Sequence, residues 1–462
     1  MTIWPPSPDR LKRPIYRSIA QAFIEAVAAG EFKNGMRLPP HRRLAYDLGV
    51  SIHTISRAYE ELTRIGLIKG EVGRGSYVTA GSAEVGTPWQ AVGESEQVID
   101  LSMLVPVRSA WHDERMRDAL RALAEDLPIS AYSSFRPRTT LRSHCDAAQI
   151  WLQQHCGLDV PRERILPTNG CTTAMTVALM TAAVPGDVIL TEDLGHHTIK
   201  ALGRSLGLRM KGVAMDAEGL LPQAVHDAAT KGATAIFVMP SGLSPTTAFM
   251  SEARRLAIVE VARKCDLLII ENDAWGPVMK NRPPPLAALA PERTLYLTGL
   301  SKLTVAGMRI GWLVVPDRLV TTSRTRHLVT SWMATPLIAE IATRWINDGT
   351  ASDMLRFQQE QFTRRNRLAR KILGHLDLRS GESGMHVWLN LPEDWSAPEF
   401  VAHARNERVA IGASANFQVS DNDHPNGVRI CLGATSERDL AEGLRILSTL
   451  AQSTQEPAVF AL

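Results

Sequence analysis

Residues 294–315 read TLYLTGLSKLTVAGMRIGWLVV, two apolar runs on either side of a short polar loop. Similar apolar runs occur earlier, at 188–192, 235–240 and 267–272, with helical stretches between them. Continuous apolar strands that end at Gly, Pro or acidic residues are typical of a largely parallel sheet covered by helices on both faces. The sequence therefore predicts an α/β domain of about 360 residues that starts near residue 98.

The loop between the two runs carries Lys302 and, seven residues later, Arg309. A lysine becomes a Schiff-base nucleophile when a desolvated, positively charged environment lowers its pKa. Arg309 supplies such a charge, and its planar guanidinium can clamp a phosphate through two hydrogen bonds. The segment LPTNGCTTAM (166–175) leads from a strand through Gly170 into a helix, whose N-terminal amides and Thr172 hydroxyl suit an anion. These features favour a lysine that works beside a bound phosphate.

Bulk composition excludes several classes of protein. The chain has 462 residues, of which 45% are hydrophobic and 21% charged, and this indicates a globular protein with more than one domain. No apolar run approaches the ~18 residues that a membrane span needs, and the basic start lacks the apolar stretch of a secretory signal. The five cysteines form no CxxC pair, so we expect reduced thiols, a cytoplasmic location and neither a disulfide framework nor a metal site.

The N-terminal segment differs from the rest in charge and in pattern. Residues 1–80 hold 12 Lys and Arg against 7 Asp and Glu. Helical spacing at 14–29 is followed by two shorter helical patterns at 41–48 and 52–65, and then by two short strands around a glycine-rich turn at 67–78. This order predicts a winged helix-turn-helix DNA-binding domain over residues 1–79, although a solvated basic cap has the same charge. Residues 80–97, rich in Gly, Ser, Ala and Glu, are expected to be a linker.

The second helix of the turn keeps Ile55, Tyr59 and Leu62 on one side for the core. Its other side shows short hydrogen-bonding side chains and an arginine near the N-terminal end, which suits reading of the major groove. Two arginines at the start of the preceding helix are placed for phosphates, and one at the wing tip for the minor groove or the backbone. The phosphate-contacting arginines are Arg42 and Arg43, and the wing-tip arginine is Arg74. The full set of candidate DNA contacts is Arg42, Arg43, Ser51, His53, Thr54, Ser56, Arg57 and Arg74.

Both halves of the chain resemble known families. GVSIHTISRAYEEL (49–62) and GLIKGEVGRGSYV (66–78) resemble the winged helix of the GntR transcription regulators, many of which have an Arg in place of Ile52. The lysine loop, the 166–175 turn and the segments VPGDVILTEDLGHH (184–197), PSGLSPTT (240–247) and LIIENDAW (268–275) resemble the fold-type I aminotransferases. A head and body in this order resemble the MocR subfamily of GntR regulators over nearly the whole chain. The resemblance implies a mostly parallel large part at about 98–330 and a smaller α+β part at about 331–450.

The resemblance also implies pyridoxal 5′-phosphate (PLP) as the cofactor. Lys302 falls on the lysine that binds it as an imine, and Arg309 on an Arg that contacts its phosphate. Cys171 and Thr172 fall on the phosphate-binding turn, and His196 on an aromatic residue that stacks on the pyridine ring. From the residues alone, His196 also fits an ordinary loop histidine, and Cys171 fits a small buried residue.

Two further positions imply partners. Tyr132 falls on a Tyr that reaches the phosphate of the partner subunit, which implies a homodimer. Arg429, in GVRICLG, falls on the Arg that receives the carboxylate of an amino acid, so the resemblance implies an amino-acid or amine effector. A structural ion pair is the alternative role for Arg429.

Several positions depart from the enzyme pattern. The Asp that usually pairs with the pyridine nitrogen falls on Asn272, with Asp273 beside it, and the sequence leaves open which of the two meets that nitrogen. The Tyr that touches the phenolic oxygen falls on Trp275, the Asn of the usual NPTG loop on Ser244, and a phosphate-binding Ser or Thr on Gly299. A neutral amide holds the proton of the pyridine nitrogen poorly, so we expect transamination to be slow or absent.

Three functions fit this pattern. The chain is a transcription regulator that responds to PLP or to an amino acid or amine, an aminotransferase with an accessory DNA-binding domain, or a DNA-binding protein whose body only dimerises. The altered ring partners disfavour the second function. The retention of Lys302, Arg309 and Arg429 disfavours the third. We therefore predict a homodimeric regulator that binds a double-stranded DNA operator.

Overall fold

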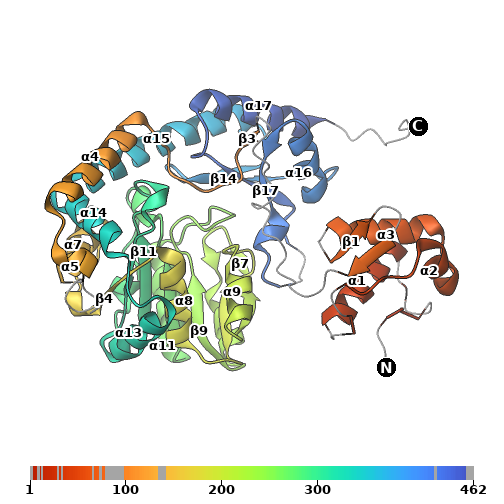
Figure 1. The fold of residues 1–462 in the computed structure, drawn as a ribbon, viewed down its shortest axis with the longest axis horizontal. Coiled ribbons are helices and arrows are strands. Elements are labelled where there is room, and N and C mark those ends of the chain that lie inside the picture. Colours follow the sequence, from red (N-terminus) through yellow and green to blue (C-terminus); the bar gives the residue numbers. More distant parts are fainter. Residues whose placement is uncertain are drawn as a thin grey trace. The chain divides into compact units, whose positions relative to one another are not determined.

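The computed structural model describes the chain except for residues 1–3, 8–10, 12–13, 29–30, 33–34, 65–66, 72–74, 79–97, 134–141, 421–423 and 454–462. The chain forms two compact units, Met1–Glu96 and Gln97–Leu462, here called the head and the body (Figure 1). The expected linker at 80–97 and the wing-tip residue Arg74 lie outside the described residues. Across the described ranges, no helix is both long enough and apolar enough to span a membrane.

The head has the helix, helix-turn-helix and hairpin order that the sequence predicts. Its elements are α1 (Ile15–Ala28), α2 (His41–Leu48), α3 (Ile52–Arg64), β1 (Ile68–Glu71) and β2 (Gly75–Val78). Gly49 makes the tight turn between α2 and α3 at a φ of +64°, a conformation that favours glycine. Ser51 caps α3, since its Oγ accepts the Thr54 N–H at 3.1 Å. Ile55, Tyr59 and Leu62 are buried as predicted.

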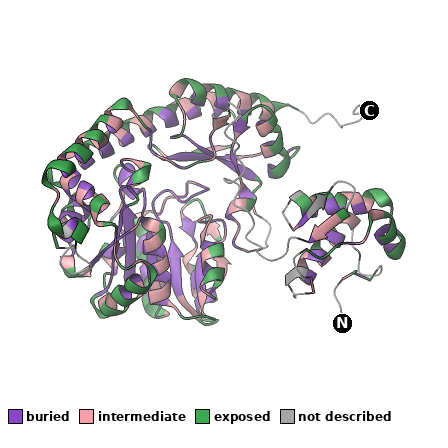
Figure 2. Cartoon of the chain, viewed as in Figure 1, coloured by how far each residue is buried: buried purple, intermediate pink, exposed green. Residues whose placement is uncertain are grey.

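The body is built on a seven-stranded sheet in the order β4-β12-β11-β10-β9-β5-β6. The strands are β4 (Ile165–Thr168), β5 (Val188–Glu192), β6 (Arg209–Val213), β9 (Ala233–Val238), β10 (Leu268–Asn272), β11 (Thr294–Gly299) and β12 (Gly311–Val314). Only β12 is antiparallel to its neighbours, β11 and β4. The prediction of a mostly parallel sheet is therefore confirmed. Figure 2 shows these strands largely buried, apart from the edge strand β6, which is mostly half-buried.

Helices cover both faces of this sheet, because adjacent residues of a strand pack into different clusters. Ile189 and Ile270 pack in a cluster with α8, whereas Leu190 and Ile269 pack in a second cluster with α10 and α11. The helices of this large part are α4 (Ala110–Asp126), α5 (Ile129–Ser133), α7 (Arg142–Trp151), α8 (Cys171–Ala182), α9 (Ile199–Ser205), α10 (Pro222–Ala229), α11 (Glu252–Lys264), α12 (Leu286–Leu289), α13 (Val320–Ser331) and α14 (Pro336–Asn347), and β7 (Met215–Asp216) and β8 (Gly219–Leu220) form a small hairpin.

The small part of the body has a four-stranded sheet in the order β13-β14-β17-β16. Its elements are α15 (Thr350–Leu373), β13 (Leu378–Ser380), β14 (His386–Asn390), α16 (Ala397–Asn406), β15 (Val409–Ala410), β16 (Gly412–Ala413), β17 (Gly427–Cys431) and α17 (Glu437–Gln452).

Two contacts of the body cross the expected division at residues 98 and 331. The first strand, β3 (Ile99–Asp100), pairs with β15 of the small part. Helix α14, expected in the small part, packs against α7 of the large part as well as against α15. Both contacts join residues far apart in the chain, so local sequence patterns do not predict them.

Two glycines bring β11 and β12 unusually close together. Gly299 lies opposite Gly311 in the antiparallel pair. A Cβ on Gly299 would lie 2.6 Å from the carbonyl oxygen of Ile310 and 2.9 Å from the Cα of Gly311. Backbone atoms cannot move aside as a flexible side chain does, so this position excludes the Ser or Thr found in related enzymes.

We expect the substitution Gly299→Ala to lower the free energy of unfolding of the body by about 1–3 kcal/mol, because it overpacks a backbone contact. Urea unfolding followed by circular dichroism measures this change. Gly307→Ala is the matched control, since nothing lies within 4 Å of an added Cβ there. Equal unfolding midpoints for the two variants would contradict the close approach of the strands.

Candidate functional site

Lys302 lies in the loop after β11, and its Nζ donates a hydrogen bond to the carbonyl of Leu104. Burial lowers the pKa of Lys302 to about 8, and the charges of Arg429 and Arg309 act in the same direction. Among the residues that the structure describes, Lys302 forms no ion pair with a carboxylate. A lysine with this pKa is partly neutral near physiological pH and is therefore a competent nucleophile.

The N-terminus of α8 and Arg309 together form an anion cradle. Gly170 precedes the helix with a φ of +80°, and a Cβ on it would lie 3.1 Å from Nη2 of Arg309. Cys171 and Thr172 are the first residues of α8, and its first turn holds no acidic residue. Free backbone amides at a helix start next to a guanidinium are well suited to a phosphate. The structure therefore brings together the two groups, Arg309 and the start of α8, from which the sequence predicts an anion site.

Cys171 has a packing role as well as its place at the helix start. Burial raises the pKa of its thiol to about 12, so it stays protonated at physiological pH. A Cβ on Gly299 would lie 3.1 Å from the Cys171 Sγ. The thiol therefore fills the space beside Gly299. This packing role corresponds to the alternative considered for Cys171 in the sequence, that of a small residue in the interior.

The sequence analysis missed Ser301, which directly precedes Lys302. Its hydroxyl is buried and has no hydrogen-bond partner within the described part of the chain. Buried polar groups are normally satisfied, so an orphaned hydroxyl beside the lysine points to a ligand oxygen. The signal in the sequence was the Ser-Lys dipeptide at the end of an apolar strand.

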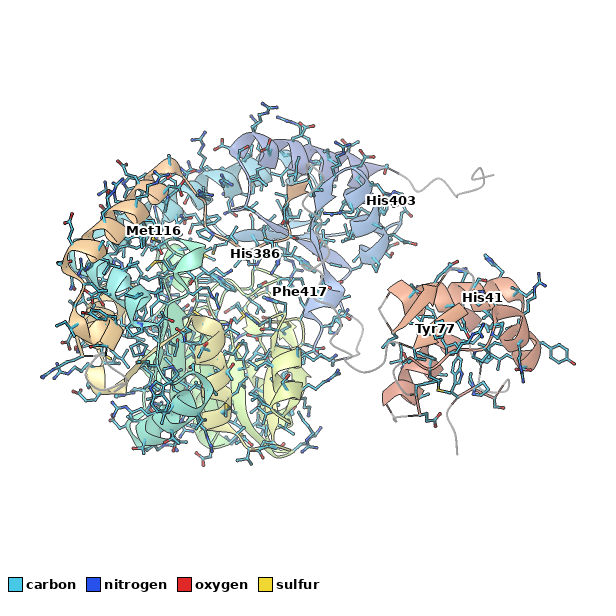
Figure 3. The ribbon with its side chains drawn as sticks, in the orientation of Figure 1. His41, Tyr77, Met116, His386, His403 and Phe417 are labelled. Atoms are coloured by element: carbon cyan, nitrogen blue, oxygen red, sulfur yellow. The ribbon has the colours of Figure 1, made fainter. Side chains whose placement is uncertain are left out.

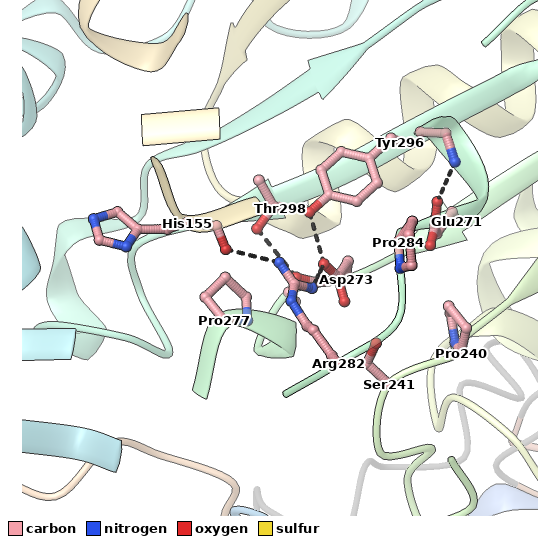
Figure 4. A network of polar contacts seen from close by, with 12 residues as sticks. His155, Pro240, Ser241, Glu271, Asp273, Pro277, Arg282, Pro284, Tyr296 and Thr298 are labelled. Atoms are coloured by element: carbon pink, nitrogen blue, oxygen red, sulfur yellow. Dashed lines mark hydrogen bonds and ion pairs between the residues drawn. The ribbon is translucent and has the colours of Figure 1, made fainter. Parts of the chain in front are cut away.

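Asn272 and Asp273, the two candidates for the ring nitrogen, have different partners. The amide oxygen of Asn272 accepts the Ala274 N–H at 3.3 Å, which leaves the amide nitrogen to donate. Asp273 forms a buried ion pair with Arg282, and Tyr296 Oη donates to its Oδ2 at 2.7 Å (Figure 4). One carboxylate oxygen of Asp273, Oδ2, is thus engaged by a cation and a phenol of its own chain, whereas its buried Oδ1 has no hydrogen-bond partner within the described part of the chain.

Trp275 and Ser244 also use their polar groups within the protein. The indole Nε1 of Trp275 donates to the carbonyl of Gly242 at 3.1 Å, so this N–H is not free for a cofactor oxygen. Ser244 Oγ accepts a hydrogen bond from Arg429 Nη1 at 2.9 Å. Ser244 therefore orients the arginine instead of acting as a free polar group.

Arg429 is a buried cation without a counter-charge. The residue is only 5% exposed, and its Nη2 donates to the carbonyl of Ser102 at 2.6 Å. Its guanidinium carbon lies 4.7 Å from the centroid of the Phe417 ring. Nε has no partner, and Arg429 forms no ion pair with any described carboxylate, which disfavours the structural ion pair considered above. A buried, uncompensated guanidinium favours an anionic ligand such as a carboxylate.

Three neutral histidines line the surroundings of these cations. His196 stacks on His197 with ring centroids 4.6 Å apart, and its Nδ1 accepts the Thr198 N–H at 3.3 Å. Burial, followed by the charges of Lys302 and Arg429, lowers the pKa of His196 to about 4. Burial and Arg429 lower the pKa of His386, labelled in Figure 3, to about 3. The site therefore adds no further positive charge at neutral pH.

Tyr132 does not join this site within its own chain. It lies on α5, and 64% of its surface is exposed. The residues that follow it, 134–141, lie outside the described residues.

The head brings most of the expected DNA contacts to one exposed surface. Arg42, Arg43, Ser51, His53 and Arg57 are exposed on α2 and at the start of α3, whereas Thr54 and Ser56 are half-buried.

Two of these polar groups are fixed by neighbours. The Ser56 hydroxyl lies 3.1 Å from Nδ1 of His41 on α2. This hydrogen bond links α3 to α2, so the hydroxyl is already engaged within the head. The Arg57 guanidinium stacks on Tyr16, 4.2 Å from the ring centroid, and this contact holds it in place. Ile52 adds an apolar side chain, 49% exposed, at the first position of α3.

Comparison with known families agrees with this geometry. Residues 106–447 match the family described as aminotransferase class I and II. The chain belongs to this family. Residues 15–78 match the bacterial regulatory proteins of the gntR family. The order of the two matches confirms the resemblance to GntR regulators with an aminotransferase-like body.

Individual relatives have the same organisation. YdeF of Bacillus subtilis (strain 168), described as an HTH-type transcriptional regulator, is 26% identical over 97% of this chain and 96% of its own. PdxR of Corynebacterium glutamicum, described as an HTH-type pyridoxine biosynthesis transcriptional regulator, is 28% identical over 67% of this chain and 70% of its own. An archaeal alanine:glyoxylate aminotransferase superposes with a TM-score of 0.71 at 23% identity, over 77% of this chain and 91% of its own, which confirms the fold.

The lowered pKa of His386 predicts a loss of stability in acid. Below the ordinary value of 6.5 the unfolded chain takes up a proton at this histidine, whereas the folded protein does so only near pH 3. Stability therefore falls as the pH drops from about 6.5, by up to ~1.4 kcal/mol per pH unit for this one group. We expect His386→Gln to have a shallower decline in urea-unfolding free energy between pH 6 and pH 4.

The control for this measurement is His403→Gln, which replaces an exposed histidine of α16. Its pH dependence should match that of the unmodified protein. If the unfolding free energy of His386→Gln fell between pH 6 and pH 4 as steeply as that of this control, the buried imidazole would have to take up its proton in the folded protein as readily as in the unfolded chain.

Proposed function

We propose that the protein is a PLP-dependent transcription regulator: a homodimer that binds operator DNA through the head and senses PLP, or an amino acid or amine, through the body. The observation that carries the proposal is the pair of cations, the half-buried Lys302 and the buried Arg429, which lack carboxylate partners among the described residues and lie in a body joined to a GntR-type head. The relative described as a regulator of pyridoxine biosynthesis supports the link to this cofactor. A chromosomal target implies a cytoplasmic location.

The residues of the body fit PLP. Arg309 and the N-terminus of α8 would hold the phosphate, and the orphaned Ser301 hydroxyl would donate to an oxygen nearby. Lys302 would present its amine, the Asn272 amide nitrogen would donate to the ring nitrogen, and His196 would lie against the ring. When bound, PLP supplies an electrophilic aldehyde carbon at which amines react.

The same residues favour sensing over catalysis. Transamination needs a protonated ring nitrogen, which a carboxylate normally holds. The Asp273 carboxylate is paired with Arg282 and accepts from Tyr296 through Oδ2, and the Asn272 amide offers a neutral donor to the ring nitrogen. A ligand amine would therefore react in place of Lys302 and its carboxylate would bind at Arg429, while the proton transfers of a full turnover would be slow.

An exposed apolar surface supports the homodimer. Large apolar side chains are exposed on α4, α5, the end of α13 and α14, and α14 packs against both α4 and α5. Monomers rarely leave such a patch open to water, so a second copy is the proposed partner. These side chains are Leu120, Ile129, Tyr132, Val329, Trp332 and Leu337.

The head surface predicts two kinds of DNA-binding defect. Arg42→Ala should weaken binding to all sequences alike and reduce the slope of the salt dependence by about one, because it removes a phosphate contact. His53→Ala and Arg57→Ala should each weaken operator binding by about 1–3 kcal/mol and relax sequence preference. Fluorescence anisotropy with operator and scrambled DNA over a salt series measures both effects.

Arg445→Ala, an exposed arginine on α17 of the body, is the control and should leave affinity unchanged. A triple variant of Arg42, His53 and Arg57 with unaltered affinity and salt dependence would rule out the head as the DNA-binding surface.

The position of Lys302 predicts where PLP becomes covalently attached. After incubation with PLP and reduction by borohydride, we expect the mass of one cofactor on the peptide that contains Lys302. Lys302→Ala should lose this mass, whereas Lys280→Ala, an exposed lysine, should keep it. A keto-acid assay with a panel of amino acids should detect little or no turnover.

Turnover of the order of 1–1000 per second would favour the aminotransferase alternative instead. A protein that acquires no cofactor mass would exclude a PLP-dependent role for the body.

A further inference from the structure

The segment that joins the linker to the body passes across the site. Residues 101–107 follow β3 directly, and two of their backbone carbonyls bond to the two ligand-facing cations. Arg429 Nη2 donates to the carbonyl of Ser102 at 2.6 Å, and Lys302 Nζ donates to the carbonyl of Leu104. The only part of the body that connects to the linker is therefore held by the two groups that a ligand needs.

This segment, here called the strap (Ser102–Pro106), is anchored at both ends by groups outside the site. On the linker side, the Leu101 N–H donates to Ala410 O at 2.8 Å, and the Cys431 N–H donates to Leu101 O at 2.7 Å. On the far side, the Gln358 side chain makes two hydrogen bonds of 2.8 Å with the backbone of Val107.

Between these anchors, the two cations provide the charged contacts of the strap. The Ser102 N–H and hydroxyl donate to Asp100 Oδ1, at 2.8 and 2.6 Å, and so hold the start of the strap to β3. The Cys431 thiol is a second, weaker donor to the carbonyl of Ser102, at 3.4 Å. The carbonyl of Val105 passes close to Gly433, where a Cβ would lie 1.8 Å from the carbonyl oxygen. Lys302 and Arg429 therefore bind the strap, and Gly433 leaves the space that the carbonyl of Val105 needs.

A ligand competes directly with these carbonyls. A carboxylate accepts a stronger, charge-assisted hydrogen bond from a guanidinium than a neutral carbonyl does. A Lys302 nitrogen that is engaged with a ligand also has fewer N–H groups to give to Leu104. Occupation of the site therefore removes the charged contacts of the strap without touching its terminal anchors.

We propose that the strap is the coupling element: Leu104 is released when Lys302 is engaged by the aldehyde of PLP, Ser102 is released when Arg429 is engaged by the carboxylate of a ligand, and either loss loosens the start of the body where the linker begins. This inference rests on the proposed function for its link to DNA. The release itself depends only on the hydrogen bonds of the strap.

The first test uses the protein without ligand and measures amide hydrogen exchange in peptides that cover residues 99–107. Lys302→Ala and Arg429→Gln should each speed exchange there by about tenfold, the effect of losing a hydrogen bond to a charged group. Lys280→Ala should leave it unchanged. Unchanged exchange in both site variants, with an intact circular dichroism spectrum, would overturn the strap whatever the function of the protein.

The second test adds the probes PLP alone and PLP with L-alanine, and should show the same faster exchange in the unmodified protein. A protein that binds PLP without any change at 99–107 would overturn the strap and leave the proposed function standing. A protein that binds no PLP would overturn the proposed function, while the first test still decides the strap.

The third test displaces the strap from outside the site. Gly433→Ala pushes on Val105 O, and Gln358→Met removes the anchor at Val107, so either variant should show fast exchange at 99–107 without ligand. Operator affinity should then equal that of the ligand-bound unmodified protein and no longer respond to PLP with L-alanine. Gly307→Ala is the control. Fast exchange with an unaltered ligand response would show that the strap does not transmit the signal.

Discussion

The absence of a carboxylate beside the cations Lys302 and Arg429 is the constraint on which the site depends. Lys302 is half-buried and Arg429 is buried, and none of the described acidic residues forms an ion pair with either. Burying a charge is costly unless something compensates it, so backbone carbonyls, the Ser244 hydroxyl and the Phe417 ring share that role. A carboxylate would compensate these charges more strongly than such neutral groups do, and this is the physical basis of the proposed response to an anion.

The opposite arrangement occurs directly after β10. Asp273 has a counter-charge in Arg282 and a phenol donor in Tyr296, and all three are largely buried (Figure 4). Both contacts are made through Oδ2, and the buried Oδ1 has no hydrogen-bond partner among the described residues. The described acidic group nearest to Asn272 in the chain is thus paired within the fold, while Lys302 and Arg429 are not paired with any described carboxylate. The proposed preference for binding over turnover rests on this difference.

The head imposes a second, independent requirement. Its exposed arginines and short polar side chains lie on α2 and the start of α3, and apolar residues of α1, α2, α3 and the hairpin form a core of its own. The body begins with β3, which is tied into the small part by β15.

The sequence by itself determined the order of the domains, every strand of the main sheet except β6, and the core of the DNA-binding helices, and it singled out Lys302, Arg309 and Arg429 as candidates. Strong local patterns carry this information: apolar runs of strand length, helical spacing and a lysine loop at a strand end. Only the tertiary structure decided that β3 pairs with β15, that Asp273 is bound by Arg282, and that the strap contacts both Lys302 and Arg429. Each of these rests on contacts between residues far apart in the chain, which no local pattern encodes, because the same side chain can point to either face until its neighbours are in place.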